Sequence, residues 1–196
     1  MGFTIVEKIK ALFNIRDSRK WLFLFLVLGI TEYGYAQPGE YVIKGVFLEK
    51  FTRFIEWPKS AGVDDTTKPF IVGIIGKDPF KSLLNQLYTA QKIKNKRVEV
   101  RYLTNISEIG DCNLLFISRS ERNRISKIIE LTRQKPILTV SDADGFSGSG
   151  VIINLLLSDN KIRFEINENA ARQASLYMSH LLLKEAIIVD SSRGWE

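Results

Sequence analysis

Short apolar runs rich in β-forming residues alternate with helix-like segments between residues 69 and 140, and this alternation limits the fold more than any other feature of the sequence. Asp78 and Pro79 predict the start of one intervening helix, since Asp is a good N-cap and Pro suits the first helical position. Ser120 opens a second predicted helix, which runs to about Thr132. The predicted strands are residues 70–75, 98–103, 114–117 and 137–140. Strands that alternate with helices predict a parallel or mixed sheet covered by helices.

The C-terminal part of the chain adds an antiparallel element. Residues 151–157 and 162–166 are two apolar runs joined by a polar turn, a pattern that predicts a β-hairpin. Asn167 is expected to cap a last helix over residues 168–184, and residues 186–189 are expected to form a final strand. The predicted fold is therefore a single α/β domain, with a mixed and mostly parallel sheet flanked by helices and a C-terminal β-hairpin and helix.

Residues 41–57 predict a helix that Pro58 stops, because proline disfavours helical geometry in the residue before it. The apolar positions cover roughly two-thirds of the helix circumference, which is wider than the stripe of a helix that faces one core and water. Such a helix is either buried on two sides or keeps one face for a partner. The candidates for its core and partner-binding positions are Phe47, Phe51, Phe54 and Trp57.

The N-terminal segment predicts export. A basic stretch precedes residues 21–30, a run of ten apolar residues and glycine, whereas a membrane-spanning helix needs about 20 apolar residues. Gly34 and Ala36 then supply the small residues that a signal peptidase requires for a cut before Gln37. We expect residues 1–36 to be a cleaved signal peptide and residues 37–196 to be a periplasmic domain with its core at about 41–189. An uncleaved N-terminal anchor is the alternative.

The composition excludes several kinds of chemistry. The chain has one cysteine, Cys112, and one histidine, His180, so it can form neither an intramolecular disulfide nor a multi-histidine or Cys/His zinc site. We expect Cys112 to be buried as a small apolar side chain and His180 to lie on the exposed side of the last helix. No convergent acid, base and nucleophile can be named, so we expect no enzyme, metal or cofactor. An exported chain is also not expected to bind nucleic acid.

Charged and glycine-rich segments leave ligand binding open. The formal charge of +6 falls to +4 without residues 1–36, which hold five basic and three acidic side chains. Basic clusters at residues 92–101 and 119–135 are either solvated faces or contacts for anionic lipids, a polyanion or an acidic domain. The loop at 145–150 leads into a strand, so a tight turn is favoured over a nucleotide loop, with an anion or glycan contact as the alternative. Asp142 and Asp144 are expected to cap turns.

Four blocks of sequence resemble the YfiR/HmsC-like family of exported proteins. The first is residues 44–58, an aromatic helix that ends in Trp-Pro, and the others lie within residues 76–80, 138–146 and 153–179. The similarity covers about residues 41–189. It implies a periplasmic α/β domain whose better-understood relatives bind the periplasmic sensor region of an inner-membrane diguanylate cyclase. Those relatives thereby lower cyclic-di-GMP output and biofilm formation.

The resemblance implies a membrane-anchored signalling protein as the partner, with a homodimer left open. The alternative is a periplasmic receptor that binds a small molecule or cell-wall fragment and reports to a sensor kinase. One departure concerns redox chemistry: relatives often have a cysteine in the first strand that can pair with the one matching Cys112, and this chain has Gly73 there. The resemblance therefore implies no redox-controlled disulfide in this chain.

Polar residues in the most family-like part of the chain form a second candidate site, where open α/β sheets have a crevice. Arg163 and Arg172 are expected to form an anion-contacting or partner-contacting patch with the loop at 145–150. The alternative is structural, with Asn167 only capping its helix and Arg163 only pairing with Glu165. The full candidate set is Asp142, Phe146, Asn154, Arg163, Glu165, Asn167 and Arg172.

Overall fold

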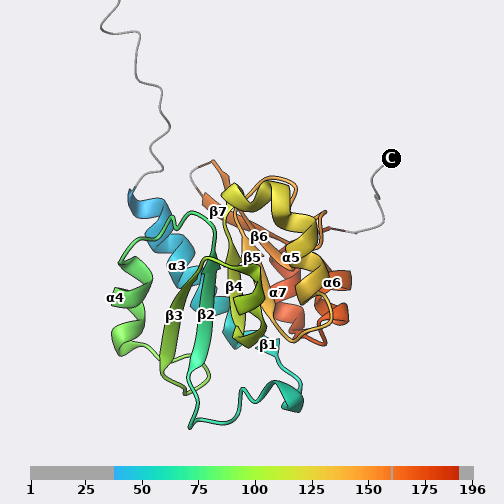
Figure 1. Cartoon of the computed structure of the whole chain (residues 1–196). Helices are drawn as coiled ribbons and strands as arrows, with labels where there is room; N and C mark the ends of the chain where they lie inside the picture. The colour runs from blue at the N-terminus through green and yellow to red at the C-terminus, as the bar shows by residue number, and fades with distance from the viewer. Residues whose placement is uncertain (1–37, 160, 190–196) are drawn as a thin grey trace, which may run out of the picture. The chain divides into compact units, whose positions relative to one another are not determined.

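The computed structural model describes residues 38–159 and 161–189 (Figure 1). The helical elements are α3 (Pro38–Arg53), η1 (Lys59–Ala61), α4 (Leu83–Ala90), η2 (Ile106–Asp111), η3 (Arg119–Arg124), α5 (Ile125–Thr132), α6 (Glu168–Gln173) and α7 (His180–Lys184). The strands are β1 (Ile55–Glu56), β2 (Phe70–Ile75), β3 (Val98–Leu103), β4 (Leu114–Ile117), β5 (Leu138–Ser141), β6 (Ile153–Ser158), β7 (Lys161–Ile166), β8 (Tyr177–Met178) and β9 (Ile187–Ile188).

The described residues form a seven-stranded sheet in the order β3-β2-β4-β5-β6-β7-β9 and a small ribbon of β1 and β8. The five strands β3-β2-β4-β5-β6 are parallel to one another, and β7 returns antiparallel to β6 through the hairpin. The last strand, β9, is parallel to β7. The predicted class, a mostly parallel mixed sheet flanked by helices with a C-terminal hairpin and helical region, is confirmed.

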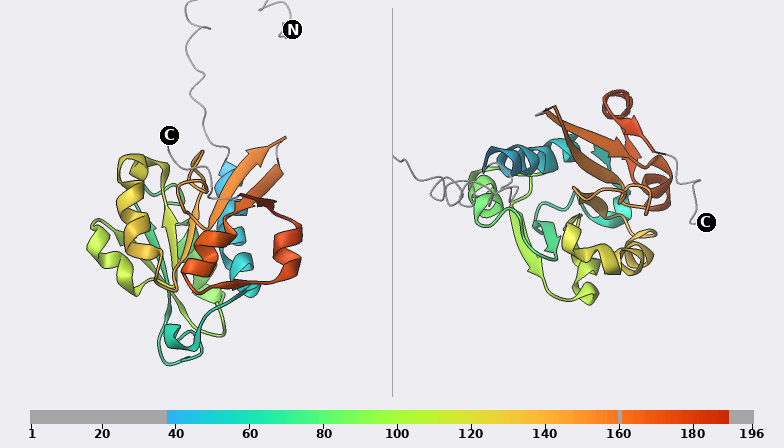
Figure 2. Two further views of the ribbon diagram at one scale, coloured as in Figure 1. Left: turned by 90° about the vertical axis from the view of Figure 1, so that its right-hand side faces the viewer. Right: turned by 90° about the horizontal axis from the view of Figure 1, so that it is seen from above.

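Helices cover both faces of the sheet (Figure 2). Successive residues of a strand point to opposite faces, so each central strand contributes side chains to two cores. Val72 and Ile74 of β2 belong to the core under α3 and α4, where Leu48, Phe51 and Leu84 are also buried. Ile75 of β2 belongs to a second core, which includes side chains of η2 and α5. The near-continuous burial of β2, β4 and β5 is what a parallel sheet covered on both faces requires.

The predicted end of the aromatic helix at Trp57 is wrong. Helix α3 ends at Arg53, and Ile55 and Glu56 form β1 instead, paired with Met178 and Tyr177 of β8. The N–H of Ser179 also donates to the carbonyl of Phe54 at 2.8 Å. Pairing with a distant segment therefore ends the helix before Pro58 acts on it.

The predicted single helix over residues 168–184 is also wrong. Asn167 caps α6 as expected, with its side chain accepting a hydrogen bond from the N–H of Ala170. The helix stops at Gln173, and Ser175 adopts a left-handed conformation with φ of 56°. The chain then forms β8, and Ser179 caps the separate helix α7 by accepting from the N–H of Leu182. His180 begins α7 and is exposed, as expected.

Two other predicted helix starts need correction. Asp78 caps a turn rather than a helix, since its Oδ1 accepts from the N–H of Phe80 and α4 begins only at Leu83. The segment predicted to open at Ser120 begins as the 3-10 turn η3, for which Ser118 is the N-cap, and becomes α-helical at Ile125.

The strand order places a topological switch point between β2 and β4. The connection after β2 leads through α4 to β3 on one side, whereas the connection after β4 leads through α5 to β5 on the other side. Open α/β sheets bind ligands and partners most often at the carboxyl ends of such strands. At this end Gly76 has φ of 91°, and a Cβ there would lie 2.5 Å from Oγ of Ser120, so only glycine fits.

Candidate functional site

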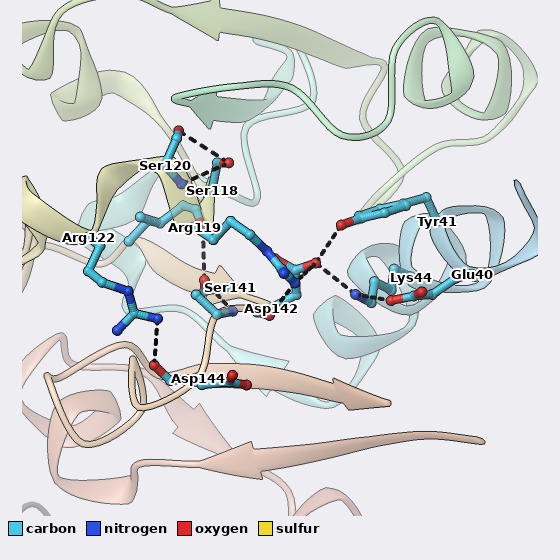
Figure 3. Close-up of polar contacts among 12 residues, drawn as sticks. Glu40, Tyr41, Lys44, Ser118, Arg119, Ser120, Arg122, Ser141, Asp142 and Asp144 are labelled. Atoms are coloured by element: carbon cyan, nitrogen blue, oxygen red, sulfur yellow. Dashed lines mark hydrogen bonds and ion pairs between the residues drawn. The ribbon is translucent and has the colours of Figure 1, made fainter. Parts of the chain in front are cut away.

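A buried carboxylate, Asp142, directly follows the carboxyl end of β5 and is the centre of a polar network beside the switch point. Three side chains converge on it (Figure 3). Nζ of Lys44 lies 2.7 Å from its Oδ2, the hydroxyl of Tyr41 donates to the same oxygen at 2.9 Å, and a guanidinium nitrogen of Arg119 lies 3.7 Å away. Two of these partners come from α3, so the network fastens α3 to the end of the sheet.

Lys44 is a lysine in an unusual place. Its side chain is 2% exposed, as is that of Asp142, and its ammonium also contacts a carboxylate oxygen of Glu40 at 2.5 Å. Glu40, Lys44, Asp142 and Arg119 together carry two negative and two positive charges. A buried ion is tolerated only with such compensation, because burial removes the water that solvates it.

The remaining contacts of the network fix its outer side. Arg119 has a side chain that is 66% exposed and also donates to the backbone carbonyl of Asp142 at 3.3 Å. Burial, and next the charge of Asp142, raise the pKa of Tyr41, so this phenol stays a hydrogen-bond donor throughout the physiological range. Asp142 was expected to cap a turn. Its side chain instead joins the sheet to a helix about 100 residues earlier in the chain.

Hydroxyl and basic groups surround this network at the ends of β2 and β4. The N–H of Lys77 donates to Oγ of Ser120 at 2.9 Å, which ties the two strand ends together. Arg122 donates to the carbonyl of Asp144 at 3.1 Å, and its guanidinium lies 5.2 Å from the ring centre of Phe146. Nothing in this arrangement provides a nucleophile beside a base. In the part of the chain that the structure describes, no three His, Cys, Asp or Glu side chains are grouped to hold a metal ion.

The aromatic residues predicted for α3 and its end divide between the core and the surface. Phe51 is 1% exposed and packs on Phe164 with ring centres 5.1 Å apart, so it is a core residue. Phe47 and Trp57 are half-buried against the same core, and Nε1 of Trp57 donates to the carbonyl of Pro136. Phe54 is 37% exposed. Of the four candidates, Phe54 is therefore the most accessible to a partner.

Helix α3 exposes apolar side chains and buries charged ones, the reverse of the usual arrangement on a surface helix. Val42 and Ile43 are 43% and 48% exposed, whereas Lys44 and Glu49 of the same helix are buried. Two exposed cations, Lys50 and Arg53, lie on this side, and Arg53 is ion-paired with Glu49 at 2.7 Å. We call this apolar and basic surface, together with Phe54, the α3 face; its residues are Val42, Ile43, Phe47, Lys50, Arg53 and Phe54. Val42 and Ile43 were absent from the predicted contacts, although the width of the apolar arc was the signal for them.

The second predicted site separates into a buried network and two exposed arginines. Oε2 of Glu165 accepts from Oγ of Ser147 at 2.5 Å and from Nδ2 of Asn154 at 3.1 Å. Asn167 donates to the carbonyl of Ser147 at 2.8 Å, so these residues anchor the loop at 145–150. Phe146 is buried in the second core.

The two arginines of that prediction are exposed on different elements. Arg163 lies on β7 opposite Leu156, and in the described part of the chain no ion pair joins it to Glu165. Arg172 lies on α6, where its guanidinium bonds Glu168 at 3.3 Å and also contacts Asn169.

Cys112 is a free, buried thiol beside Gly73 of β2. Burial is the main cause that raises its pKa to about 11, and the nearby Arg101 lowers it only in part. A Cβ at Gly73 would lie 2.5 Å from Sγ of Cys112, which puts positions 73 and 112 within disulfide range of each other. Burial of Cys112 as a small apolar side chain is confirmed.

Comparisons with known proteins give a family but no curated relative. No curated protein matches the chain. One solved structure, described as the ABC domain in complex with L-Trp from Streptococcus pneumonia, aligns with a TM-score of 0.43 and 11% identity, over 66% of this chain and 62% of that one. This chain thus spans less than two-thirds of that structure. None of the helices in the described part of the chain has the length and apolar character of a membrane span.

The fold and the site together define a mostly parallel α/β domain whose helix α3 is held on the sheet by a buried ion pair. The family model described as YfiR/HmsC-like matches residues 41–186. The chain belongs to this family. Membership implies in general a periplasmic regulatory protein of diguanylate cyclase signalling.

Proposed function

We propose that this protein docks through its α3 face on the periplasmic sensor region of a membrane-anchored diguanylate cyclase and represses it. The observation that carries the proposal is the exposure of Val42 and Ile43 on α3, and of Phe54 directly after it, although Lys44 and Glu49 of the same helix are buried. Exposed apolar side chains gathered on one element are typical of interaction sites. Lys50 adds positive charge, whereas the charge of Arg53 is compensated by its ion pair with Glu49 at 2.7 Å, so the complementary surface is apolar with acidic groups opposite Lys50.

The buried pair of Lys44 and Asp142 supports the same proposal. It holds the first turns of α3, where Val42 and Ile43 lie, in one position on the sheet. A rigid, preorganised surface loses less conformational entropy on binding than a mobile one. The network is therefore the structural support for the docking surface, and its members are positioning residues.

Variants of the α3 face test the docking directly. Because Ile43 is half-exposed, Ile43→Asp is expected to change the free energy of unfolding by only about 1 kcal/mol or less. Loss of an interface hot spot costs about 2 kcal/mol or more of binding free energy. The affinity for the purified sensor region of the cyclase should therefore fall by at least roughly 30-fold. Titration of the purified sensor region by calorimetry measures this.

Tyr102→Asp is the matched control for that experiment. Tyr102 is 44% exposed on the edge strand β3, and its hydroxyl donates to the carbonyl of Lys81 and accepts from Asn85 of α4, so its replacement disturbs α4 and not the α3 face; the melting temperature of both variants is measured alongside. The control variant should bind as the wild type does. Equal weakening by both variants, or no weakening by Ile43→Asp, would place the docking surface elsewhere.

The proposal includes export of residues 37–196 after removal of a signal peptide at residues 1–36, which lie outside the described residues. The mass of the N-terminal peptide recovered from the periplasm tests this. We expect it to begin at Gln37, and a membrane-bound product that retains upstream peptides would contradict the cleavage.

We also propose that Arg163 and Arg172 form a second contact surface, near the loop at 145–150, that binds an anionic ligand or an acidic part of the partner. Both side chains are exposed, so Arg163→Gln and Arg172→Gln should each leave the thermal transition nearly unchanged, within about 0.5 kcal/mol. The folded double variant is expected to repress its partner less. Full repression by that variant would remove the patch from the proposal, and unfolding of either single variant would show a structural role instead.

A further inference from the structure

A basic surface lies on the face of the sheet opposite α3 (Figure 2). It is formed by η3, α5 and the turn after α5; Ile125 and Ile128 of α5 pack in the second core, whereas α3 packs in the first. Residues 119–135 hold six basic and two acidic side chains, a net charge of +4. We call this surface the α5 face; its cations, all exposed, are Arg119, Arg122, Arg124, Lys127, Arg133 and Lys135. Because the α5 face and the α3 face lie on opposite sides of the sheet, both can be occupied at once.

Most of the positive charge of the α5 face is not compensated within the fold. Arg124 bonds Glu121 at 2.7 Å, and Arg119 lies 3.7 Å from Asp142. Glu130, the other carboxylate of the segment, is exposed. The cations that take part in none of the ion pairs between described residues are Arg122, Lys127, Arg133 and Lys135. Four such cations against one exposed carboxylate make the α5 face attractive to anions.

The α5 face has none of the apolar anchors of a protein interface. The large exposed apolar side chains of the described residues all lie outside residues 119–135. Protein partners bind mainly through aromatic or aliphatic side chains that become buried in the interface. A cationic surface without such anchors fits an array of anionic groups instead, because each Lys or Arg near an anionic membrane adds to the binding.

A pocket at the end of α5 adds a more specific feature to this face. Its volume is about 380 Å³, and it is lined by Arg133, Gln134 and Gln173. This volume lies within the range of small-molecule sites. A guanidinium binds the oxygens of a phosphate, and the two amides can donate to and accept from hydroxyl groups. The pocket therefore suits a phosphate ester that carries hydroxyl groups.

We propose that the α5 face rests on the surface of an anionic phospholipid bilayer and that the pocket beside Arg133 holds a phosphoglycerol headgroup. The choice of a bilayer over a soluble polyanion rests on the proposed function, because a repressor of a membrane-anchored cyclase acts beside the membrane. Attachment raises the concentration of the protein near the sensor region. The contact is electrostatic, so it is reversible and sensitive to salt.

Sedimentation with vesicles tests this contact on residues 37–196. No cyclase is present, so the result does not depend on the docking of α3. The protein should sediment with vesicles of phosphatidylcholine and about 30% phosphatidylglycerol, and it should stay in solution with phosphatidylcholine alone. Salt at about 1 M shortens the Debye length to about 3 Å and should release the protein.

Two double variants locate the contact. Each cation near an anionic membrane strengthens binding roughly fivefold, so Lys127→Gln with Arg133→Gln should weaken it about 25-fold. Lys50→Gln with Lys92→Gln is the matched control, because it lowers the net charge equally. Lys50 lies on α3 and Lys92 follows α4, and both helices pack in the first core on the other face of the sheet. The control should bind within about threefold of the wild type. All four side chains are exposed, and the thermal transition of each variant checks its folding.

Four outcomes would overturn the proposal. The first is a wild type that stays in solution with phosphatidylglycerol vesicles, and the second is equal weakening by the two double variants. The third is release from the vesicles by soluble glycerol phosphate at the same phosphate concentration, because the pocket would then bind a free anion without a bilayer. The fourth is binding of soluble polyglutamate in preference to the vesicles, which would assign the α5 face to an acidic polymer.

Discussion

Asparagine in place of Asp142 is expected to lower the free energy of unfolding by about 3–5 kcal/mol, which is the usual cost of removing one partner of a buried ion pair. The substitution leaves the ammonium of Lys44, 2% exposed, with Glu40 as its remaining carboxylate. It also replaces the charged acceptor of the Tyr41 hydroxyl and of Arg119. Chemical denaturation of residues 37–196, followed by circular dichroism, measures the loss.

Two further variants separate the buried pair from a general effect of charge. Asp144→Asn removes an exposed carboxylate two residues away and should change stability by no more than about 0.5 kcal/mol. The triple variant Glu40→Gln, Lys44→Met and Asp142→Leu removes the two carboxylates together with the ammonium that they share and should recover most of the loss, because no largely buried ion is then left. A loss below about 1 kcal/mol for Asp142→Asn would mean that the pair does not hold α3.

Cysteine in place of Gly73 is expected to form a disulfide with Cys112 under oxidising conditions. A Cβ at position 73 would lie 2.5 Å from Sγ of Cys112, so the two sulfurs can meet after a small rotation of the Cys112 side chain. The bond would close a loop of about 40 residues, for which the entropy model gives a stabilisation of roughly 4 kcal/mol over the reduced form. Thiol titration and thermal denaturation with and without reductant measure both effects.

Gly73→Ala is the control for that variant. Its added methyl group meets Sγ of Cys112 at 2.5 Å and Leu103 and Leu115 at 3.2 Å, so overpacking should cost about 1–3 kcal/mol. Reduced Gly73→Cys should be destabilised in the same way, and oxidation should reverse this. Free thiols in the folded, oxidised Gly73→Cys protein would show that positions 73 and 112 do not face each other as the structure has them.

Much of the sheet could be predicted from sequence because its strands are buried on both faces. Strands β2, β3 and β4 have the predicted bounds, and β5 is shifted by one residue, since continuous apolar runs leave little choice of position. The errors concern local signals that distant pairing overrides. The apolar pattern that continued the first helix to Trp57 belongs partly to β1, and the pattern that continued the last helix through Ser175 is interrupted by β8.

The site was less predictable because it depends on contacts between segments far apart in the chain. Lys44 follows the helical pattern as a charge that belongs outside, and only its pairing with Asp142 explains why it is buried. Asp142 was predicted as a turn cap and as a member of the second candidate site, but not as the partner of a buried lysine. Glu165, Asn154 and Asn167 were grouped together in the sequence and do share a network with the loop at 145–150, through Ser147.

The central claim, that the α3 face represses a membrane diguanylate cyclase, is tested most directly by the cyclic-di-GMP content of cells. A strain that lacks this chain should be complemented with the wild type, Ile43→Asp or Tyr102→Asp, at equal amounts in the periplasm. We expect the wild type and Tyr102→Asp to lower cyclic-di-GMP and Ile43→Asp to leave it as high as in the deletion strain. Full repression by Ile43→Asp, or no change of cyclic-di-GMP with the wild type, would contradict the claim.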